Sequence, residues 1–349
     1  MAEEYRDTDR RQGRRSAGRF CALVLLSCAA LLLAAILLGL VFGASGVGVG
    51  DVWALATGQD MAAKARSILV SIRIPRVLAG VLAGAAFSVS GALIQEVLDN
   101  PLASPNIIGA NSGAGLAVLT VSALATVGIA LPLPLPAAAF LGALVASGLI
   151  LLVSLRTGVS RLTVVLAGVA VNAVFSAGMN AVLIIAPNAY IGSSTYLVGG
   201  LSGIVMSDLG LPAVLISAGI VLASVLAPRL NVLSLGSQAA HAVGVPVALL
   251  RAAGLAIASL LAGASVSFSG LIGFIGLMVP HVARRFVGHD LRCVIPVSAL
   301  WGAAFTVAAD LLARTLFAPY ELPVGILMSA VGGPFFIFLL MKGKGYRDE

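Results

Sequence analysis

The chain has 349 residues, of which 60% are hydrophobic and only 10% are charged. Soluble domains carry about 25% charged residues, so the composition excludes a water-soluble protein and predicts one that lies mostly in lipid. The net charge of +7 does not indicate nucleic-acid binding, because Lys and Arg gather in the N-terminal tail and the short loops and form no aromatic-interleaved basic face.

The first apolar run, residues 20–43, is predicted to be a retained membrane span. Its core, Phe20–Phe42, is 23 residues long, whereas the apolar region of a signal peptide has roughly 7–15 residues. Further runs long enough to cross about 30 Å of hydrocarbon follow at 74–97, 107–131, 135–155, 162–186, 208–227, 247–268, 293–313 and 323–341. One more segment, 271–287, is short and broken by glycines and Pro280, so hydropathy alone leaves it open.

Loop charge favours ten spans with both termini in the cytoplasm, because Lys and Arg prefer the cytoplasmic side of short loops. With ten spans, sixteen of the 21 basic residues lie inside and five lie outside: Lys64, Arg66, Arg73, Arg76 and Arg314. We therefore expect a multi-pass protein of the cell membrane with a basic cytoplasmic tail over 1–19, a transmembrane domain over 20–341 and a cytoplasmic tail over 342–349. Residues 187–207 would lie outside and are expected to form a partial helix or a re-entrant cap.

An internal repeat indicates what such a protein does. Val81–Gly91 and Leu260–Gly270 are identical at seven of eleven positions and fall in the second and seventh expected spans. Spans that are five apart cross the membrane in opposite directions, and inverted repeats of this kind place a transport path at the membrane midplane. Transport is therefore the leading hypothesis. In the second and third expected spans, Gly80, Gly84, Gly109 and Gly113 are expected to let helices pack closely.

The three cysteines are predicted to be buried, small apolar residues. Cys21 and Cys28 are seven positions apart, which is about 10 Å along one helix and too far for a disulfide. Cys293 stands alone in the sequence. No cluster of His and Cys has the spacing of metal ligands, so no cofactor is expected.

The chain shows no chemistry that would power transport. It contains no GxxxxGK[ST] loop for nucleotide phosphates, so an ATP-driven mechanism needs an ATPase on another chain. A proton-coupled transporter would need ionisable groups deep in the bilayer, but Glu96, His281, Asp310 and Glu321 all lie near expected span ends. Asp310 could simply pair with Arg314 four residues later. Proton coupling is therefore disfavoured but open, and a structural membrane scaffold is a more distant alternative.

Specific segments lie throughout the chain after residue 70: RIPRVLAGVLAGAAFSVSGALIQ (73–95), NPLASPNIIGANSGA (100–114), LSLG and GV within 233–245, GLIGFIGLMVPHVARRFVGHD (270–290), ADLLAR (309–314), and ELPVGI and GGPFF within 321–336. With these segments, most of the chain after residue 70 resembles the FecCD permeases, the membrane subunits of ABC importers for ferric siderophores, haem and cobalamin. The resemblance implies an all-α, type II ABC importer permease fold with ten transmembrane helices. It also implies the partners: a second permease subunit in a homodimer or heterodimer, two cytoplasmic ABC ATPase subunits and an extracytoplasmic substrate-binding protein.

The resemblance assigns the loop at about 229–246 to contact with the ATPase, whereas the residues alone would also allow a plain connector. Ser237 stands where the family usually has glutamate and His241 where it has arginine, which puts the usual ion pairs with the ATPase in doubt. The implied coupling residues are Leu235, Gly236, Ser237, Gln238, Ala240, His241 and Gly244.

The resemblance also assigns Arg73, Arg76 and Arg314 to an outer surface that receives glutamates of the binding protein. These are three of the five basic residues that the loop-charge argument leaves outside. The alternative is ordinary snorkelling of long side chains at the membrane interface, with Arg314 paired to Asp310.

Asn172, Ser176 and Asn180 recur every four residues and therefore share one face of the fifth expected span. Polar residues in a membrane helix either bond across helices or line a wet path. Because the family has its fifth and tenth spans at the central path, these residues and Ser329 are expected to line it. The expected cargo is an iron(III)–siderophore complex, with haem or cobalamin as alternatives.

Overall fold

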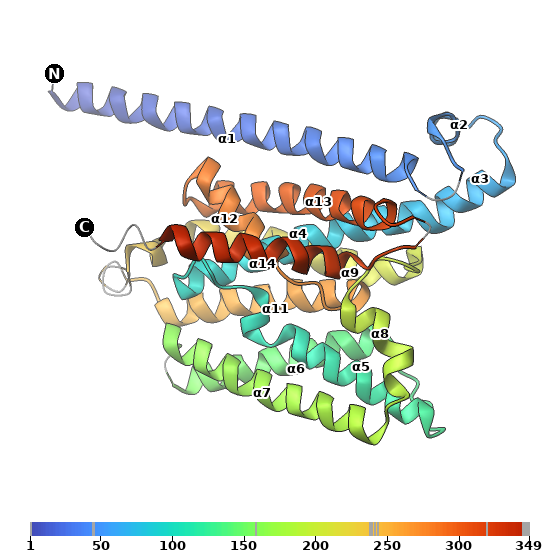
Figure 1. Ribbon diagram of the computed structural model, residues 1–349. Helices are drawn as coiled ribbons and strands as arrows, with labels where there is room; N and C mark the ends of the chain where they lie inside the picture. The colour runs from blue at the N-terminus through green and yellow to red at the C-terminus, as the bar shows by residue number, and fades with distance from the viewer. Residues whose placement is uncertain are drawn as a thin grey trace.

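All the regular secondary structure in the computed structural model is helical within the parts of the chain that it describes: residues 2–43, 46–157, 159–236, 240, 242, 244–318 and 320–343 (Figure 1). Within these residues, seven stretches of helix are long and apolar enough to cross a membrane. They contain α1 (Ala2–Val41), α4 (Ile74–Leu98), α6 (Leu135–Arg156), α7 (Arg161–Ile185), α9 (Met206–Leu230), α11 (Val247–Ser269) and α13 (Leu291–Thr315).

The remaining elements are shorter. Two are apolar enough to be candidates for the other expected spans, α5 (Ala110–Thr126) and α14 (Val324–Gly343). Helix α12 (Ile275–Val287) has 13 residues, about 20 Å of helix against a hydrocarbon core of about 30 Å. Ten crossings therefore stay a prediction. The short connecting elements are α2 (Val49–Thr57), α3 (Ala63–Ile68), η1 (Leu69–Arg73), η2 (Pro105–Ile108), α8 (Ala189–Val198) and η3 (Asn231–Leu235).

One boundary differs from that expected from the sequence, and one expected short helix is present. The first helix begins at Ala2, well before the expected span at residue 20, because the basic stretch that precedes the apolar run continues the same helix. The loop at 187–207 contains α8, which confirms the predicted partial helix.

Helix α4 lies at the centre of the bundle. It packs against α11, α12, α13 and α9, while α1 lies at the edge of the bundle along α13 (Figure 1). Close packing of α4 depends on small residues: a Cβ on Gly84 would overlap the carbonyl oxygen of Gly302 in α13. A Cβ on Gly113 would likewise overlap the carbonyl oxygen of Gly142, so the prediction of close packing at both glycines is confirmed.

The two copies of the repeat pack against each other in opposite directions. Ser90 Oγ in α4 donates to the carbonyl oxygen of Ala258 in α11 at 2.7 Å. Further along α4, Val97 lies against Gly254, which comes earlier in α11. Since a higher number in α4 meets a lower number in α11, the helices are antiparallel, as the repeat predicts.

The glycine that ends each copy is required by a close approach. A Cβ on Gly91 would overlap the carbonyl oxygen of Gly276 at the start of α12. A Cβ on Gly270, whose φ is 68°, would overlap the carbonyl oxygen of Tyr196 in α8. The last glycine of each copy therefore marks a place where another backbone passes directly against it, within α4 at Gly91 and at the end of α11 at Gly270.

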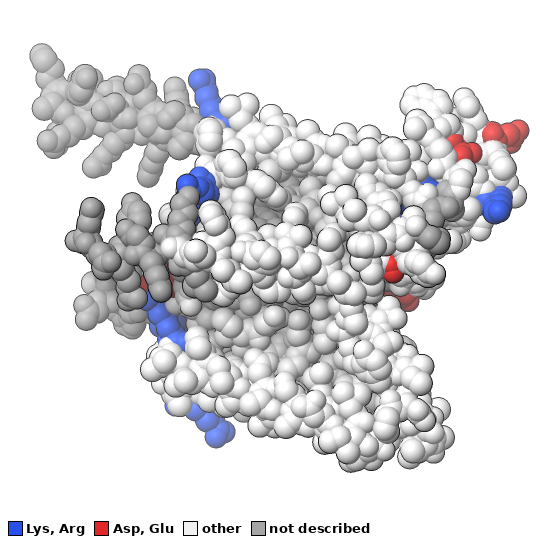
Figure 2. Space-filling model, in the orientation of Figure 1, with Lys and Arg blue, Asp and Glu red and all other residues white. Residues whose placement is uncertain are grey.

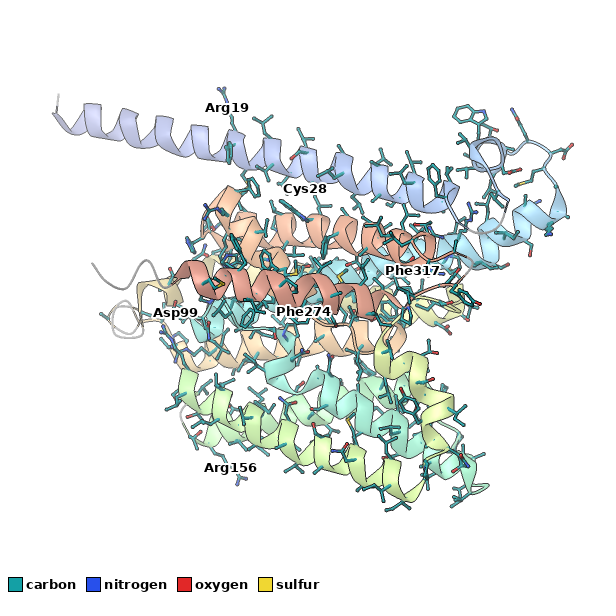
Figure 3. The ribbon with its side chains drawn as sticks, viewed as in Figure 1. Arg19, Cys28, Asp99, Arg156, Phe274 and Phe317 are labelled. Carbon is teal, nitrogen blue, oxygen red and sulfur yellow. A yellow bond between two sulfur atoms is a disulfide. The ribbon has the colours of Figure 1, made fainter. Side chains whose placement is uncertain are left out.

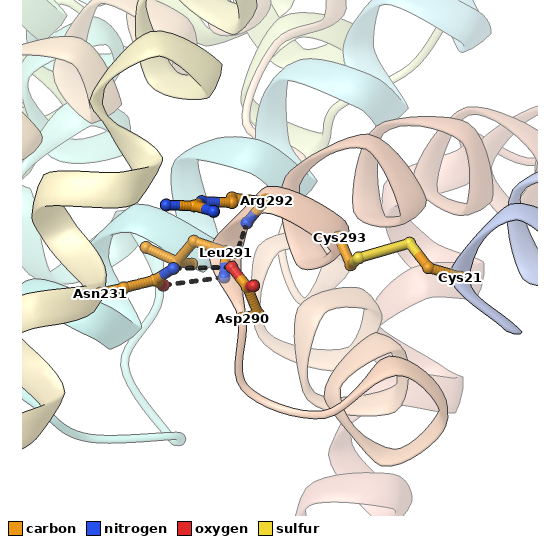
Figure 4. Close-up of a disulfide and its surroundings, with 6 residues drawn as sticks. All are labelled: Cys21, Asn231, Asp290, Leu291, Arg292 and Cys293. Atoms are coloured by element: carbon orange, nitrogen blue, oxygen red, sulfur yellow. Dashed lines mark hydrogen bonds between the residues drawn. A yellow bond between two sulfur atoms is a disulfide. The ribbon is translucent and has the colours of Figure 1, made fainter. Parts of the chain in front are cut away.

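The prediction for the cysteines was wrong for two of the three. Cys21 in α1 and Cys293 in α13 form a disulfide (Figure 4), while Cys28 is free and buried. The two partners are 272 residues apart, and they meet because α1 lies along α13. Sequence spacing could exclude the Cys21–Cys28 pair but could not show this contact.

Charge on the surface follows the ends of the helices. On the face shown in Figure 2, Lys, Arg, Asp and Glu gather at two opposite ends and leave an uncharged belt between them. Large apolar side chains of α7 and α9 are also exposed, among them Val174, Leu211 and Val225. Such a belt suits a protein surrounded by hydrocarbon.

Candidate functional site

Four buried charged residues and one exposed carboxylate form a cluster at one end of the bundle, which we call the arginine cluster: Arg73, Arg76, Asp310 and Arg314 are buried, and Glu321 is exposed. At its centre, Arg76 Nε lies 2.9 Å from Asp310 Oδ2, and Arg76 Nη2 donates to Asp310 Oδ1 at 3.0 Å. Arg76 Nη1 also lies 2.6 Å from Glu321 Oε2. Only 6% of Arg76 and 4% of Asp310 is exposed, so this two-pronged pair joins α4 to α13 away from water.

The local explanation for Asp310 is therefore insufficient. Arg314, four residues later, approaches Asp310 no closer than 3.9 Å. The main partner, Arg76, is separated from Asp310 by 234 positions, which is why sequence reasoning missed it.

Arg73 and Arg314 are used to cap the end of α1. Arg73 Nη1 donates to the carbonyl oxygens of Leu40 and Val41, the latter at 2.7 Å, and Arg314 Nη2 donates to the carbonyl oxygen of Gly39. The last carbonyls of a helix have no partner within it and carry partial negative charge. Two guanidinium groups supply both the missing donors and the opposite charge.

These contacts bear on the predicted docking role of Arg73, Arg76 and Arg314. All three are at least 94% buried and have partners within the chain. Docking stays a prediction, and an acidic partner would have to compete with those internal contacts. The member of the cluster with the most accessible side chain is Glu321, at 40%.

A second buried ionic cluster, which the sequence did not suggest, joins α4 to α12 near the other end of α4. Arg284 Nη2 lies 3.5 Å from Glu96 Oε2 and donates to the carbonyl oxygen of Ala92 at 3.1 Å. Arg284 Nη1 donates to Gln95 Oε1, and Gln95 Nε2 donates to the carbonyl oxygen of Leu277 at 3.2 Å. These contacts hold the broken segment around Pro280 against the central helix.

The same contacts weaken the case for proton coupling. Of the ionisable candidates, Glu96 faces Arg284, while Asp310 and Glu321 both face Arg76. Carboxylates held by arginine at helix ends are suited to fixed structural pairing. A proton carrier needs a carboxylate that can be neutralised during the cycle.

The polar residues of α7 divide into two groups. Asn172 bonds across helices: its Nδ2 donates to the carbonyl oxygen of Asn106 at 3.0 Å, and its Oδ1 accepts from Ser112 Oγ at 2.5 Å. It therefore fastens α7 to the Pro- and Gly-broken segment before α5. Ser176 and Asn180, one and two turns further along, are exposed on the surface of the chain.

Ser329 is exposed on α14, and its Oγ donates to the carbonyl oxygen of Gly325 at 2.9 Å within the same helix. Helix α14 packs chiefly against α12 and α13, whereas α7 packs chiefly against α5 and α6. Within the described part of the chain, Ser329 therefore lies apart from Asn172 and its hydrogen-bond partners. The four predicted path residues occupy two separate helices with open surfaces.

Helix α8 fixes the end of α11 and the start of α14. The Tyr196 hydroxyl donates to the carbonyl oxygen of Val266, and burial raises the pKa of that phenol well above its ordinary value, which keeps the donor proton in place. Gly325 N–H donates to the carbonyl oxygen of Gly199 at 3.0 Å. The short helix thus links the second repeat copy to a helix that is expected to line the path.

Helix α12 meets α14 at Phe274 (Figure 3). This residue has φ 65°, a left-handed conformation that is rare for a bulky side chain. Its ring lies against Gly332 of α14, where any side chain would overlap it. The joint between α12 and α14 therefore depends on one strained aromatic residue and one glycine.

The predicted coupling residues are only partly described. Ser237, Gln238 and His241, together with the side chain of Leu235, lie outside the described residues. Ala240 is buried, and Gly236 and Gly244 have φ of 89° and 75°. The two glycines thus make the turns that enclose this segment.

Comparison with known proteins identifies related chains of similar length. The sequence profile of the FecCD transport family matches residues 31–342. The chain is 36% identical over 336 residues to the hemin transport system permease protein HmuU of Yersinia pestis, covering 95% of this chain and 99% of that protein. It is 39% identical over 283 residues to the cobalamin import system permease protein BtuC of Halobacterium salinarum, covering 79% of this chain and 74% of that protein. It is 36% identical over 284 residues to the Fe(3+)-citrate import system permease protein YfmD of Bacillus subtilis, covering 81% and 84%.

Among solved structures, the chain is similar to a metal-chelate type ABC transporter in an inward-facing conformation. The TM-score is 0.80 at 27% sequence identity, and the match covers 92% of this chain and 99% of that one. The similarity therefore extends over almost the whole of both chains.

Proposed function

Because the chain belongs to the FecCD transport family, we propose that it carries an iron(III)–siderophore complex across the cell membrane. The predicted family and the type II ABC importer permease fold are confirmed. The chain is a membrane-embedded permease subunit of an ABC importer of the metal-chelate type, and such subunits work without an ATPase site of their own. The match to an Fe(3+)-citrate permease supports an iron(III) chelate as cargo. Haem is the second candidate, because the hemin permease matches over 95% of this chain, and cobalamin is the third.

The path would run along the open faces of α7 and α14. Ser176, Asn180 and Ser329 are polar and exposed, and a membrane helix seldom presents such residues to lipid. A second permease subunit placed against these faces would enclose them, with Asn172 fixing the position of α7. The path then belongs to two subunits, which can be identical or different.

The energy would come from two cytoplasmic ATPases seated on the loop at 229–246, with both termini of this chain on the same side. The residues proposed to meet the ATPase are Leu235, Gly236, Ser237, Gln238, Ala240, His241 and Gly244. ATP binding would draw the ATPases together, the antiparallel repeat halves would rock, and hydrolysis would reset them.

The binding protein would dock at the end that carries the arginine cluster. Its glutamates could reach Arg76 by replacing Glu321, the most exposed side chain of the cluster. Such a contact would chiefly orient the partner and speed its association. Replacing Arg73, Arg76 and Arg314 together would disrupt internal pairs, so Glu321→Gln is the sharper variant: it should tighten docking if Arg76 receives the partner and leave it unchanged otherwise.

Transport in proteoliposomes tests the proposal. The chain is reconstituted with its partner ATPase and binding protein, and uptake of a radiolabelled ferric hydroxamate is measured with and without ATP. We expect uptake only with ATP and with all the components. Uptake by this chain alone under a proton gradient would contradict an ABC mechanism, and preferential uptake of hemin or cobalamin would replace the proposed cargo.

A further inference from the structure

Asn231 joins the start of the coupling loop to the first turn of α13 (Figure 4). Its Nδ2 donates to Asp290 Oδ1 at 2.6 Å, and its Oδ1 accepts from the Leu291 N–H at 2.9 Å. Asp290 is the N-cap of α13, and its Oδ1 also accepts from the Arg292 N–H at 2.9 Å. One amide side chain thus uses both its donor and its acceptor on consecutive residues where α13 begins.

Asn231 lies at the point where α9 leads into the coupling loop. Helix α9 ends at Leu230, and η3 continues from Asn231 to Leu235, where the proposed ATPase contact begins. The coupling loop is covalently continuous with α9 and α11, but not with α13. Asn231 supplies a hydrogen-bonded attachment between that loop and a helix elsewhere in the sequence.

Helix α13 leads from this attachment to the opposite end of the bundle. Its 25 residues extend for about 37 Å. Its first turn is joined to α1 through Cys293, and its last turns carry Asp310 and Arg314 of the arginine cluster. A displacement of the first turn of α13 therefore acts on a helix whose last turns belong to the arginine cluster.

We propose that Asn231 is a positioning residue for transport, which transmits movement of the ATPase-bound loop to α13. The inference rests on the proposed function, since it needs an ATPase at the loop. The bond joins an amide donor to a side-chain carboxylate over 2.6 Å, and bonds of amides to carboxylates are stronger than bonds between neutral groups. Without this bond, the loop would move with the ATPase and the first turn of α13 would not follow it.

The test measures three quantities in the reconstituted complex: retention of the ATPase on the permease, ATP hydrolysis, and uptake of radiolabelled ferric hydroxamate per ATP hydrolysed. For Asn231→Ala, we expect retention and hydrolysis near the unsubstituted levels and uptake per ATP lowered about tenfold, as for loss of one hydrogen bond to a charged group. A purely structural role would instead lower retention, hydrolysis and melting temperature together, and that outcome would overturn the proposal.

A paired exchange guards against a misfolded single variant. Asn231→Asp places two carboxylates together and should uncouple as strongly as alanine does. Adding Asp290→Asn restores a donor, since the new amide can donate to the new carboxylate, and uptake per ATP should recover. Failure of the double variant to recover, with the ATPase still retained, would overturn the proposal.

Ser224→Ala, in the helix that directly precedes Asn231, is the matched control, because Ser224 Oγ donates to the Ile220 carbonyl oxygen within α9 and is exposed. It should change none of the three quantities. If the unsubstituted complex shows no ATP-dependent uptake, the proposed function itself fails. If that complex transports and Asn231→Ala transports equally well per ATP, the proposed function stands and only the role of Asn231 is rejected.

Discussion

Helices α4 and α7 are both apolar enough to cross a membrane, yet α4 is mostly buried within the chain and α7 is mostly exposed. In their most apolar 18-residue stretches, 83% of residues are buried for the span that contains α4 and 17% for α7. Helix α4 packs against α9, α11, α12 and α13 and is anchored by two ionic clusters, whereas α7 relies on α5, α6 and the Asn172 contacts. The chain alone determines the place of α4, while the outer face of α7 needs lipid or another subunit to cover it.

The largest effect should come from breaking the ion pair that anchors α4. Asp310→Ala leaves Arg76 without its two-pronged partner in a buried site, and we expect a loss of about 3–5 kcal/mol in the free energy of unfolding. Denaturation by SDS in mixed micelles measures it. Asp60→Ala, at an exposed residue outside the bundle, is the control and should leave the midpoint unchanged. Equal midpoints for both variants would show that the arginine cluster does not anchor α4.

A smaller loss should follow from crowding α4 where the repeat ends. Gly91→Ala places a methyl group against the carbonyl oxygen of Gly276, and since backbone must shift, we expect a loss of about 1–3 kcal/mol. The control is Gly148→Ala in α6, where a Cβ would meet no atom within 4 Å. That variant should be neutral or slightly stabilising, because alanine favours a helix. If Gly91→Ala matches the control, the close approach of α12 to α4 is not needed.

Arg73, the residue directly before α4, caps the end of α1, and a local effect is expected there. Arg73→Gln removes the guanidinium that serves the Leu40 and Val41 carbonyls, so the last turn of α1 should open more easily by about 1–2 kcal/mol. Hydrogen exchange of the last turn of α1 measures this opening. Arg66→Gln, at an exposed arginine in α3, should leave the exchange unchanged. Slow exchange in both variants would mean that α1 needs no cap.

The sequence predicted those features of the helices that depend on local or periodic patterns. The repeat predicted that the helices containing Val81–Gly91 and Leu260–Gly270 run in opposite directions, and the Ser90–Ala258 bond agrees. The spacing of Asn172, Ser176 and Asn180 predicted one polar face, but not that only the first of them would bond across helices.

What the sequence missed depends on contacts between distant segments. The local rule for charges four residues apart pointed Asp310 to Arg314, yet Arg76 is the closer partner. The same limit applies to the Cys21–Cys293 disulfide and the Asn231–Asp290 bond. No periodicity in one sequence encodes which helices become neighbours, because that choice is made by packing of the whole bundle.

The smallest effect on stability should come from changes in α7, where a variant is expected to keep its stability and still lose transport. Ser176→Leu with Asn180→Leu changes exposed side chains that have no tertiary role in this chain's packing, so the unfolding midpoint should stay within about 0.5 kcal/mol. If the face lines a path between two subunits, uptake of ferric hydroxamate should still fall about tenfold, because two apolar side chains replace polar groups along the route. Val174→Leu, exposed on the opposite face of α7, should change neither quantity. Full uptake in the double variant would assign the face to lipid, since hydrocarbon accepts leucine more readily than serine or asparagine, and the open side of α7 would then have no part in the path.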